Sequence, residues 1–165
     1  MTWFLFTIGG LIAIYALNKV ASKIKASKAV KRYNQMRDQK LQEMQAGYEA
    51  LKRLHPRKYP PELVQKVSRS SIAELQTLLW DEDSGIESVD LVAILGERAY
   101  THGMKNGWLA DQMFEEAYER AKQRDEERRQ ARAEGRTLSK IHGIPCSLKD
   151  HIKYKGSSSH WGLYS

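Results

Sequence analysis

The stretch that decides the fold runs from residue 141 to residue 150 and reads Ile141-His142-Gly143-Ile144-Pro145-Cys146-Ser147-Leu148-Lys149-Asp150. Within it Ile144, Cys146 and Leu148 occupy alternate positions, which predicts a short β-strand with Lys149 at its end. We therefore expect one or two short strands near the C-terminus of a chain that is otherwise predominantly α-helical.

The residues before this stretch show the spacing of amphipathic helices. Leu41, Met44, Tyr48 and Leu51 recur at helical intervals and predict a helix over 38–54, which His55-Pro56 ends. Further helices are predicted after Pro60-Pro61, after the capping box Ser71-Ile72-Ala73-Glu74, after a cap at Ser88, and from about Leu109 to near Gly135. The last part of this final helix, 124–132, is charged on every side, so we expect it to be solvated and assign it no ligand.

The excess positive charge of the chain lies in one segment. The formal net charge is +7, and the seven bases from Lys19 to Arg37 have no acid among them, while the bases and acids elsewhere are balanced. Before them, residues 1–18 carry no charged side chain. As a helix they would cover about 27 Å, which is just long enough to span a bilayer. These features predict a transmembrane anchor over 1–18, a basic juxtamembrane segment over 19–37, and a cytosolic soluble part.

Alternatives to the anchor are a cleaved signal peptide or a buried core helix. A signal peptide would need bases before the apolar run and small residues after it, and both are missing. Gly9 and Ala13 would let two anchors pack closely, so a homodimer is an expected assembly. Nucleic acid is not an expected partner, because aromatic and basic residues are not interleaved as in a base-stacking surface. The single cysteine, Cys146, excludes a disulfide within the chain.

The segment from His142 to Gly156 resembles the amidase signature family. Members carry the pattern H-G-I-P-x-S-x-K-D, and residues 142–150 match every fixed position. Tyr154-Lys155-Gly156 and Gly162-Leu163 are similar to the membrane-anchored fatty acid amide hydrolase branch, as are the helices upstream and the anchor. The resemblance implies an α/β fold with a mixed sheet surrounded by helices, in which 38–140 is the helical N-terminal part of the hydrolase and 141–165 is the incomplete start of the signature core.

By the same resemblance, Lys149 is the lysine of a Ser-Ser-Lys triad that cleaves fatty acid amides, with no cofactor and no metal. Its two serines would lie downstream, because Ser157, Ser158 and Ser159 stand in the wrong context. We therefore expect the 165-residue chain to lack the nucleophile and to be inactive alone. The expected partners are a lipid amide substrate and a membrane, with localisation as a single-pass protein of the endoplasmic reticulum or another endomembrane.

Three other functions compete with this hypothesis. A thiol hydrolase using Cys146 and His142 is disfavoured, because four residues along a strand separate them by about 13 Å. A metal site from His142, Cys146, His151 and His160 is disfavoured because the spacings fit no standard tetrahedral pattern. A non-catalytic, single-pass helical scaffold protein remains the main alternative.

Overall fold

A computed structural model describes the backbone of residues 2–156 and the side chains of residues 15–156. The chain divides into two compact units, residues 1–42 and residues 43–165. The first helix, α1, covers Thr2–Leu54, so that its N-terminal part forms the first unit and its last part belongs to the second.

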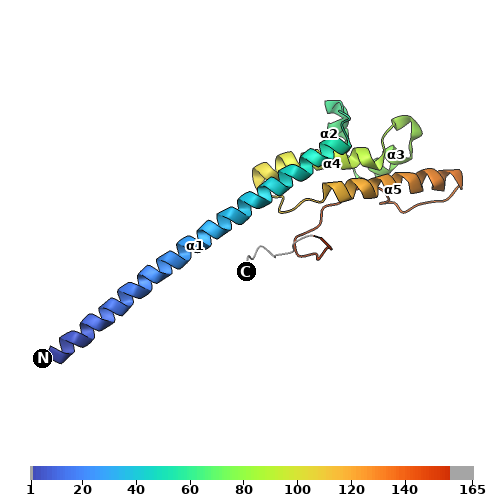
Figure 1. Ribbon diagram of the computed structural model, residues 1–165. Helices are drawn as coiled ribbons and strands as arrows, with labels where there is room; N and C mark the ends of the chain where they lie inside the picture. The colour runs from blue at the N-terminus through green and yellow to red at the C-terminus, as the bar shows by residue number, and fades with distance from the viewer. Residues whose placement is uncertain (1, 157–165) are drawn as a thin grey trace. The chain divides into compact units, whose positions relative to one another are not determined.

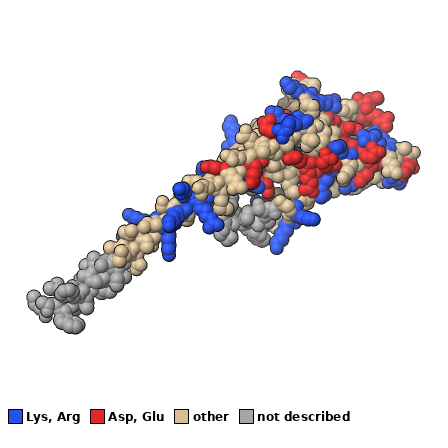
Figure 2. All heavy atoms as spheres, in the orientation of Figure 1, with Lys and Arg blue, Asp and Glu red and all other residues tan. Residues whose placement is uncertain are grey.

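The first unit presents its bases to solvent. Between residues 15 and 42 every side chain except Asn34 and Lys40 is exposed, and Figure 2 shows the Lys and Arg side chains along this helix, whereas bases and acids are interspersed on the second unit. From Lys19 onward a base recurs every few positions, so no described stretch stays apolar over the roughly 20 residues that a membrane span requires.

The predicted transmembrane helix and single-pass localisation are contradicted. Throughout the part of the chain that the structure describes, no helix is both long and apolar enough to cross a membrane. Much of the expected anchor, including Gly9 and Ala13, has side chains outside the described residues.

The second unit consists of helices joined by short connections (Figure 1). After α1 come α2 (Pro61–Arg69), α3 (Ile72–Trp80), the 3-10 turn η1 (Glu82–Ser84), α4 (Ser88–Asn106) and α5 (Phe114–Ala133). The end of α1 at Leu54, the proline start of α2 and the Ser71–Glu74 capping box of α3 confirm the sequence predictions. At α4, the backbone N–H of Glu87 donates to Asp90 at 2.6 Å, so Glu87 is the capping position and Ser88 is the first helical residue.

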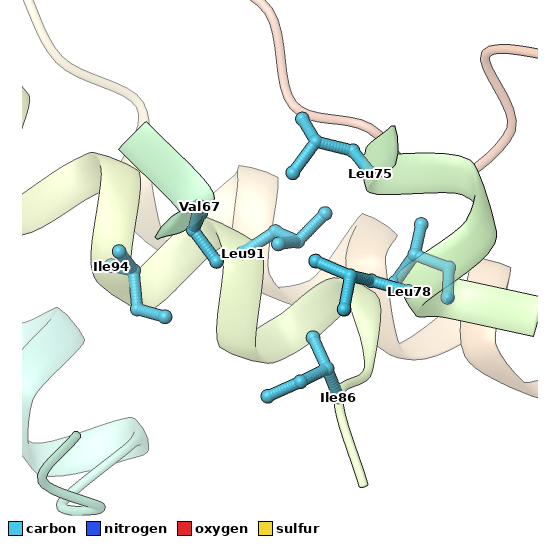
Figure 3. Packing of buried hydrophobic residues seen from close by; sticks show 7 residues of the cluster. Val67, Leu75, Leu78, Ile86, Leu91 and Ile94 are labelled. Atoms are coloured by element: carbon cyan, nitrogen blue, oxygen red, sulfur yellow. The ribbon is translucent and has the colours of Figure 1, made fainter. Parts of the chain in front are cut away.

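Two apolar clusters hold these helices together around α4. Figure 3 shows the first cluster, which contains Val67, Leu75, Leu78, Leu79, Ile86, Leu91 and Ile94 and thus joins α2 and α3 to α4. The second cluster contains Leu51, Val89, Val92, Phe114 and Ala121 and joins the end of α1 and α5 to α4. Leu91 is fully buried. Because α4 contributes to both clusters, it is the central element of the unit.

The predicted strands are absent, which contradicts the expected α/β fold for the described residues. Residues 144–149 have no regular secondary structure, and turns at 140–143 and 150–151 flank them; no strand occurs anywhere in the range 2–156. A strand needs a neighbouring strand to pair its backbone groups. Here the neighbours are helices, and Pro145 has no N–H to donate, so the alternating pattern alone does not create a ladder.

Two predictions about α5 are also wrong. The helix begins at Phe114 instead of near Leu109, because the side chain of Gln112 accepts the backbone N–H of Phe114 at 2.9 Å. The charged part from 124 to 132 is not solvated all round, since Asp125, Arg128 and Ala131 are buried. These three positions continue the buried face that begins at Phe114 and Ala121.

Candidate functional site

Lys149, the predicted catalytic lysine, lies at the end of the extended segment 144–149 and is exposed. Its carbonyl oxygen accepts the backbone N–H of Ile152 at 2.8 Å, which closes the turn that follows. The segment is held to the helices on both sides of Lys149, at His142-Gly143 before it and at Tyr154 after it. The site is therefore a lysine on a tethered, irregular segment.

His142 is the first tether. Its Nε2 lies 2.8 Å from Glu127 Oε2 on α5, and its carbonyl oxygen accepts the side-chain N–H of Gln76 on α3 at 2.9 Å. The His142 side chain is 10% exposed, and its Nδ1 is buried without a hydrogen-bond partner. The bond from His142, with help from Arg124, lowers the pKa of Glu127. A carboxylate only accepts, so Nε2 carries the proton and Nδ1 is the unsatisfied atom when the ring is neutral.

Gly143 is the second tether, and it lies directly against a buried polar cluster. Its φ angle is +80°, and a Cβ at this position would lie 2.3 Å from Ser88 Oγ and 2.9 Å from Arg128 Nη1. Both distances are shorter than van der Waals contact, so only a glycine allows the backbone to approach Ser88 and Arg128 this closely.

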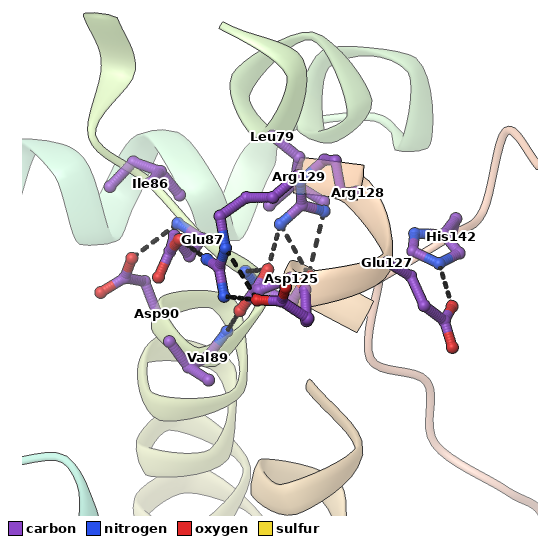
Figure 4. Close-up of polar contacts among 12 residues, drawn as sticks. Leu79, Ile86, Glu87, Val89, Asp90, Asp125, Glu127, Arg128, Arg129 and His142 are labelled. Carbon is purple, nitrogen blue, oxygen red and sulfur yellow. Dashed lines mark hydrogen bonds and ion pairs between the residues drawn. The ribbon is translucent and has the colours of Figure 1, made fainter. Parts of the chain in front are cut away.

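The polar cluster consists of Ser88, Asp125 and Arg128 (Figure 4). Asp125 accepts the backbone N–H of Ser88 at 2.7 Å and that of Val89 at 3.2 Å, so it caps the start of α4 from α5. Arg128 forms an ion pair with Asp125 and donates to Ser88 Oγ at 3.1 and 3.2 Å. Ser88 is 0%, Asp125 2% and Arg128 4% exposed, and burial lowers the pKa of Arg128 against the attraction of Asp125.

Tyr154 is the third tether, on the far side of Lys149. Its hydroxyl donates to Glu116 Oε1 on α5 at 2.6 Å, and the Arg120 guanidinium lies 5.7 Å from its ring centre. This hydrogen bond is the main cause that lowers the pKa of Glu116 and raises the pKa of Tyr154. Since Glu116 and Glu127 are both on α5, the segment runs along that helix and is attached to it on both sides of Lys149.

A cavity of about 450 Å³ lies between α5 and this segment. Its apolar lining includes Val92, Met113, Ala117, Ala121, Ile141, Ile144, Pro145 and Leu148, and its polar lining includes Arg120, Arg124, Glu116, His142 and Tyr154. Cys146 also contributes to the cavity wall and is exposed. The structure thus brings Cys146 and His142 to one cavity, but His142 directs Nε2 to Glu127, which does not support a thiol hydrolase.

A second polar network joins the end of α1 to α4 and α5. Buried Asp90 accepts the hydroxyl of Tyr59 and lies 3.2 Å from Arg57 Nη1, while His55 contacts Tyr59 through Nε2 and lies 3.3 Å from the Tyr118 hydroxyl through Nδ1. Burial, followed by the bond to Asp90, raises the pKa of Tyr59. The network lies beside a second cavity of about 440 Å³, which is lined mainly by charged residues. The polar groups of this network pair with one another, so we assign the network a structural role.

The side chains considered and disfavoured as metal ligands, His142, Cys146 and His151, do not form a centre within the described range. Among residues 15–156, no group of three or more His, Cys, Asp or Glu side chains could hold a metal ion. His160 and the serines at 157–159 lie outside the described residues.

The polar cluster was missed by sequence reasoning because 124–132 is rich in charge. A usable signal was present. Asp125, Arg128 and Ala131 follow Ala121 at intervals of three and four residues, so they continue the apolar stripe of the helix. A charged pair on such a stripe is expected to be buried and paired.

Comparison with known proteins gives no relative of this chain. No family model, no curated protein and no solved structure matches it. A functional assignment therefore depends on the motif at 142–150 and on the geometry of the segment that carries it.

Proposed function

We propose that this chain is the N-terminal part of an amidase signature hydrolase that cleaves carbon–nitrogen amide bonds with Lys149 as a catalytic base. The observation that carries the proposal is the match of residues 142–150 to H-G-I-P-x-S-x-K-D at every fixed position. A lysine accompanied by six other matching fixed positions is a far more specific signal than an isolated lysine among 27 basic residues.

The chemistry of Lys149 follows from its protonation. An amine is a base only when it is neutral, so a lysine in this role has to be shielded from water. It can then take a proton through one serine from a second serine, which attacks the amide carbonyl and forms an acyl-enzyme. Lys149 and the serine that relays the proton then return it to the leaving amine, and water hydrolyses the acyl-enzyme to release the acyl group.

The geometry supports a role in positioning for this segment. His142 and Gly143 fix its beginning, Tyr154 fixes its end, and Lys149 lies between them with its side chain exposed. In the proposal, the part of the enzyme that carries the two serines covers Lys149 and supplies the desolvation that the described residues do not.

The proposed substrates are fatty acid amides. This preference rests on the resemblance of Tyr154-Lys155-Gly156 and Gly162-Leu163 to the fatty acid amide hydrolase branch. No catalytic serine is assigned within residues 1–165, so we propose that the chain by itself is inactive.

A fluorophosphonate that labels activated serines tests the proposal on two proteins: the full-length gene product and the 165-residue chain. We expect the gene product to be labelled at one serine and to hydrolyse a primary fatty acid amide, and the 165-residue chain to do neither. A short-chain amide with the same leaving group is the control for the fatty acid preference. Specific labelling of the 165-residue chain, or no labelling and no hydrolysis by the gene product, would contradict the proposal.

The competing function is a non-catalytic helical scaffold. The exposed apolar side chains of the first unit favour it, since Leu17 is 68%, Val20 55% and Ile24 50% exposed. A scaffold requires no activated serine. The labelling experiment therefore separates the two functions, because a scaffold gives no labelled serine in either protein.

A further inference from the structure

The tight contact between Gly143 and the cluster of Ser88, Asp125 and Arg128 has a role beyond stability. We propose that this cluster is a seat that fixes where the segment carrying Lys149 begins, so that Ser88 and Arg128 are positioning residues for Lys149. The claim that the cluster fixes Gly143 depends only on the contacts seen in the structure. The claim that it positions Lys149 for catalysis also rests on the proposed function.

The seat selects glycine for two separable reasons. The φ of +80° at Gly143 is a left-handed conformation that L residues with a side chain rarely adopt. In addition, the space beside its Cα is occupied by Ser88 Oγ and Arg128 Nη1. Gly135, in the turn after α5, has φ +66° with nothing within 4 Å of an added Cβ. It therefore shares the backbone conformation of Gly143 without the contact.

The atoms under Gly143 have little freedom to withdraw. Ser88 is the first residue of α4, and its backbone N–H is bound by Asp125 at 2.7 Å. Its hydroxyl receives bonds from both terminal nitrogens of Arg128, which is itself paired with Asp125. Moving either side chain would break bonds in a buried site, where an unsatisfied polar group is costly. The seat is therefore a fixed reference point at the junction of α4 and α5.

A shift at the seat would reach Lys149 directly. Lys149 is six residues after Gly143, along a segment without regular secondary structure. The backbone between them has no ladder of hydrogen bonds to absorb a displacement: Ile144, next to Gly143, packs against the first apolar cluster, and the third tether, Tyr154, comes after Lys149. A displacement of about 1 Å in a catalytic group can cost on the order of 100-fold in rate. The contact of Gly143 with the seat thus determines how precisely Lys149 is positioned.

Amide hydrogen exchange in the 165-residue chain tests the structural part of the inference. Gly143→Ala is expected to raise exchange at the hydrogen-bonded amides of His142, Ile144 and Ile152 by at least about tenfold, whereas the matched control Gly135→Ala leaves these amides unchanged. In the double variant Ser88→Ala with Gly143→Ala, the atom closest to the new Cβ is gone. We therefore expect Gly143→Ala to reduce protection less when it is added to Ser88→Ala than when it is added to the unmodified chain. Equal effects of Gly143→Ala and Gly135→Ala, or an equal loss of protection with and without Ser88→Ala, would overturn the seat.

Amidase kinetics of the full-length gene product test the catalytic part. Gly143→Ala should lower kcat by about 10- to 100-fold with KM nearly unchanged, Gly135→Ala should leave both constants unchanged, and Ser88→Ala with Gly143→Ala should regain part of kcat. A loss of exchange protection with unchanged kcat would overturn the positioning role. If the unmodified gene product does not hydrolyse amides, the proposed function and the positioning role both fail, while the exchange result still decides the seat.

Discussion

Two neighbouring arginines on α5 offer a direct test of the buried cluster. Arg128 and Arg129 each pair with an acid three residues earlier, Asp125 and Glu126 respectively. The side chains of the first pair are 4% and 3% exposed, whereas those of the second are 52% and 72% exposed. Arg128→Ala and Arg129→Ala are therefore the same substitution, one residue apart, in opposite environments.

The expected cost differs severalfold between the two. Arg128→Ala leaves Asp125 buried without its countercharge and Ser88 Oγ without its donors, which should lower the free energy of unfolding by about 3–5 kcal/mol. Arg129→Ala removes solvent-screened pairs with Glu126 and Glu87, which are together expected to contribute no more than about 1 kcal/mol. For a unit of this size, the first change corresponds to a fall in Tm of roughly 10–20 °C.

Urea denaturation followed by circular dichroism at 222 nm measures both variants, and the loss of helix signal as the packed second unit unfolds gives the transition. We expect the transition of Arg128→Ala to shift to much lower urea with an unchanged slope, while that of Arg129→Ala stays close to the unmodified chain. If the two variants lose equal stability, Arg128 is not buried in a pair and the account of the seat fails.

Two further predictions concern the core and the first tether. Leu91→Ala should lower the free energy of unfolding by about 2–5 kcal/mol because Leu91 is fully buried in the cluster around α4; the exposed Leu54 should cost under about 1 kcal/mol when changed to Ala, and urea denaturation measures both. The pKa of Glu127 is lowered in the folded chain, so its bond to His142 stabilises the fold above the ordinary Glu pKa and is lost as pH falls below about 4. Urea denaturation at pH 5 and pH 3 should therefore show a lower free energy of unfolding for Glu127→Gln than for the unmodified chain at pH 5, by at most about 1 kcal/mol because Glu127 is half exposed, and a smaller difference at pH 3; a constant difference would contradict this role.

The helices could be predicted from sequence because their signals are local. Prolines, the Ser71 capping box and the spacing of Met44, Tyr48 and Leu51 are local signals, and the structure confirms the starts of α2 and α3 and the end of α1. The predicted start of the first of these helices at residue 38 is wrong, because α1 is continuous from Thr2. The start of α5 was misplaced because it depends on the side chain of Gln112 folding back onto the helix. Periodicity does not report such a contact.

The strand and the charged part of α5 could not be read in the same way, because both depend on neighbours distant in sequence. An alternating pattern at 144–148 forms a strand only where another strand can pair with it, and among the described residues only helices adjoin it. Asp125 and Arg128 are buried because Ser88, 37 and 40 residues earlier in the chain, bonds to both of them, and because Gly143, 15 residues after Arg128, lies beside Arg128. The candidate site thus joins a local motif, visible in the sequence, to a seat that only the fold reveals.

The most direct test of the central claim is the turnover of a primary fatty acid amide by the full-length gene product with Lys149→Ala. Lys153→Ala is the matched control, since Lys153 is an exposed lysine four residues away. The account predicts that Lys149→Ala lowers kcat by about 10²- to 10⁴-fold while Lys153→Ala stays within a few-fold of the unmodified enzyme. If Lys149→Ala retains turnover comparable to that of Lys153→Ala, Lys149 is not the base and the proposed mechanism is wrong.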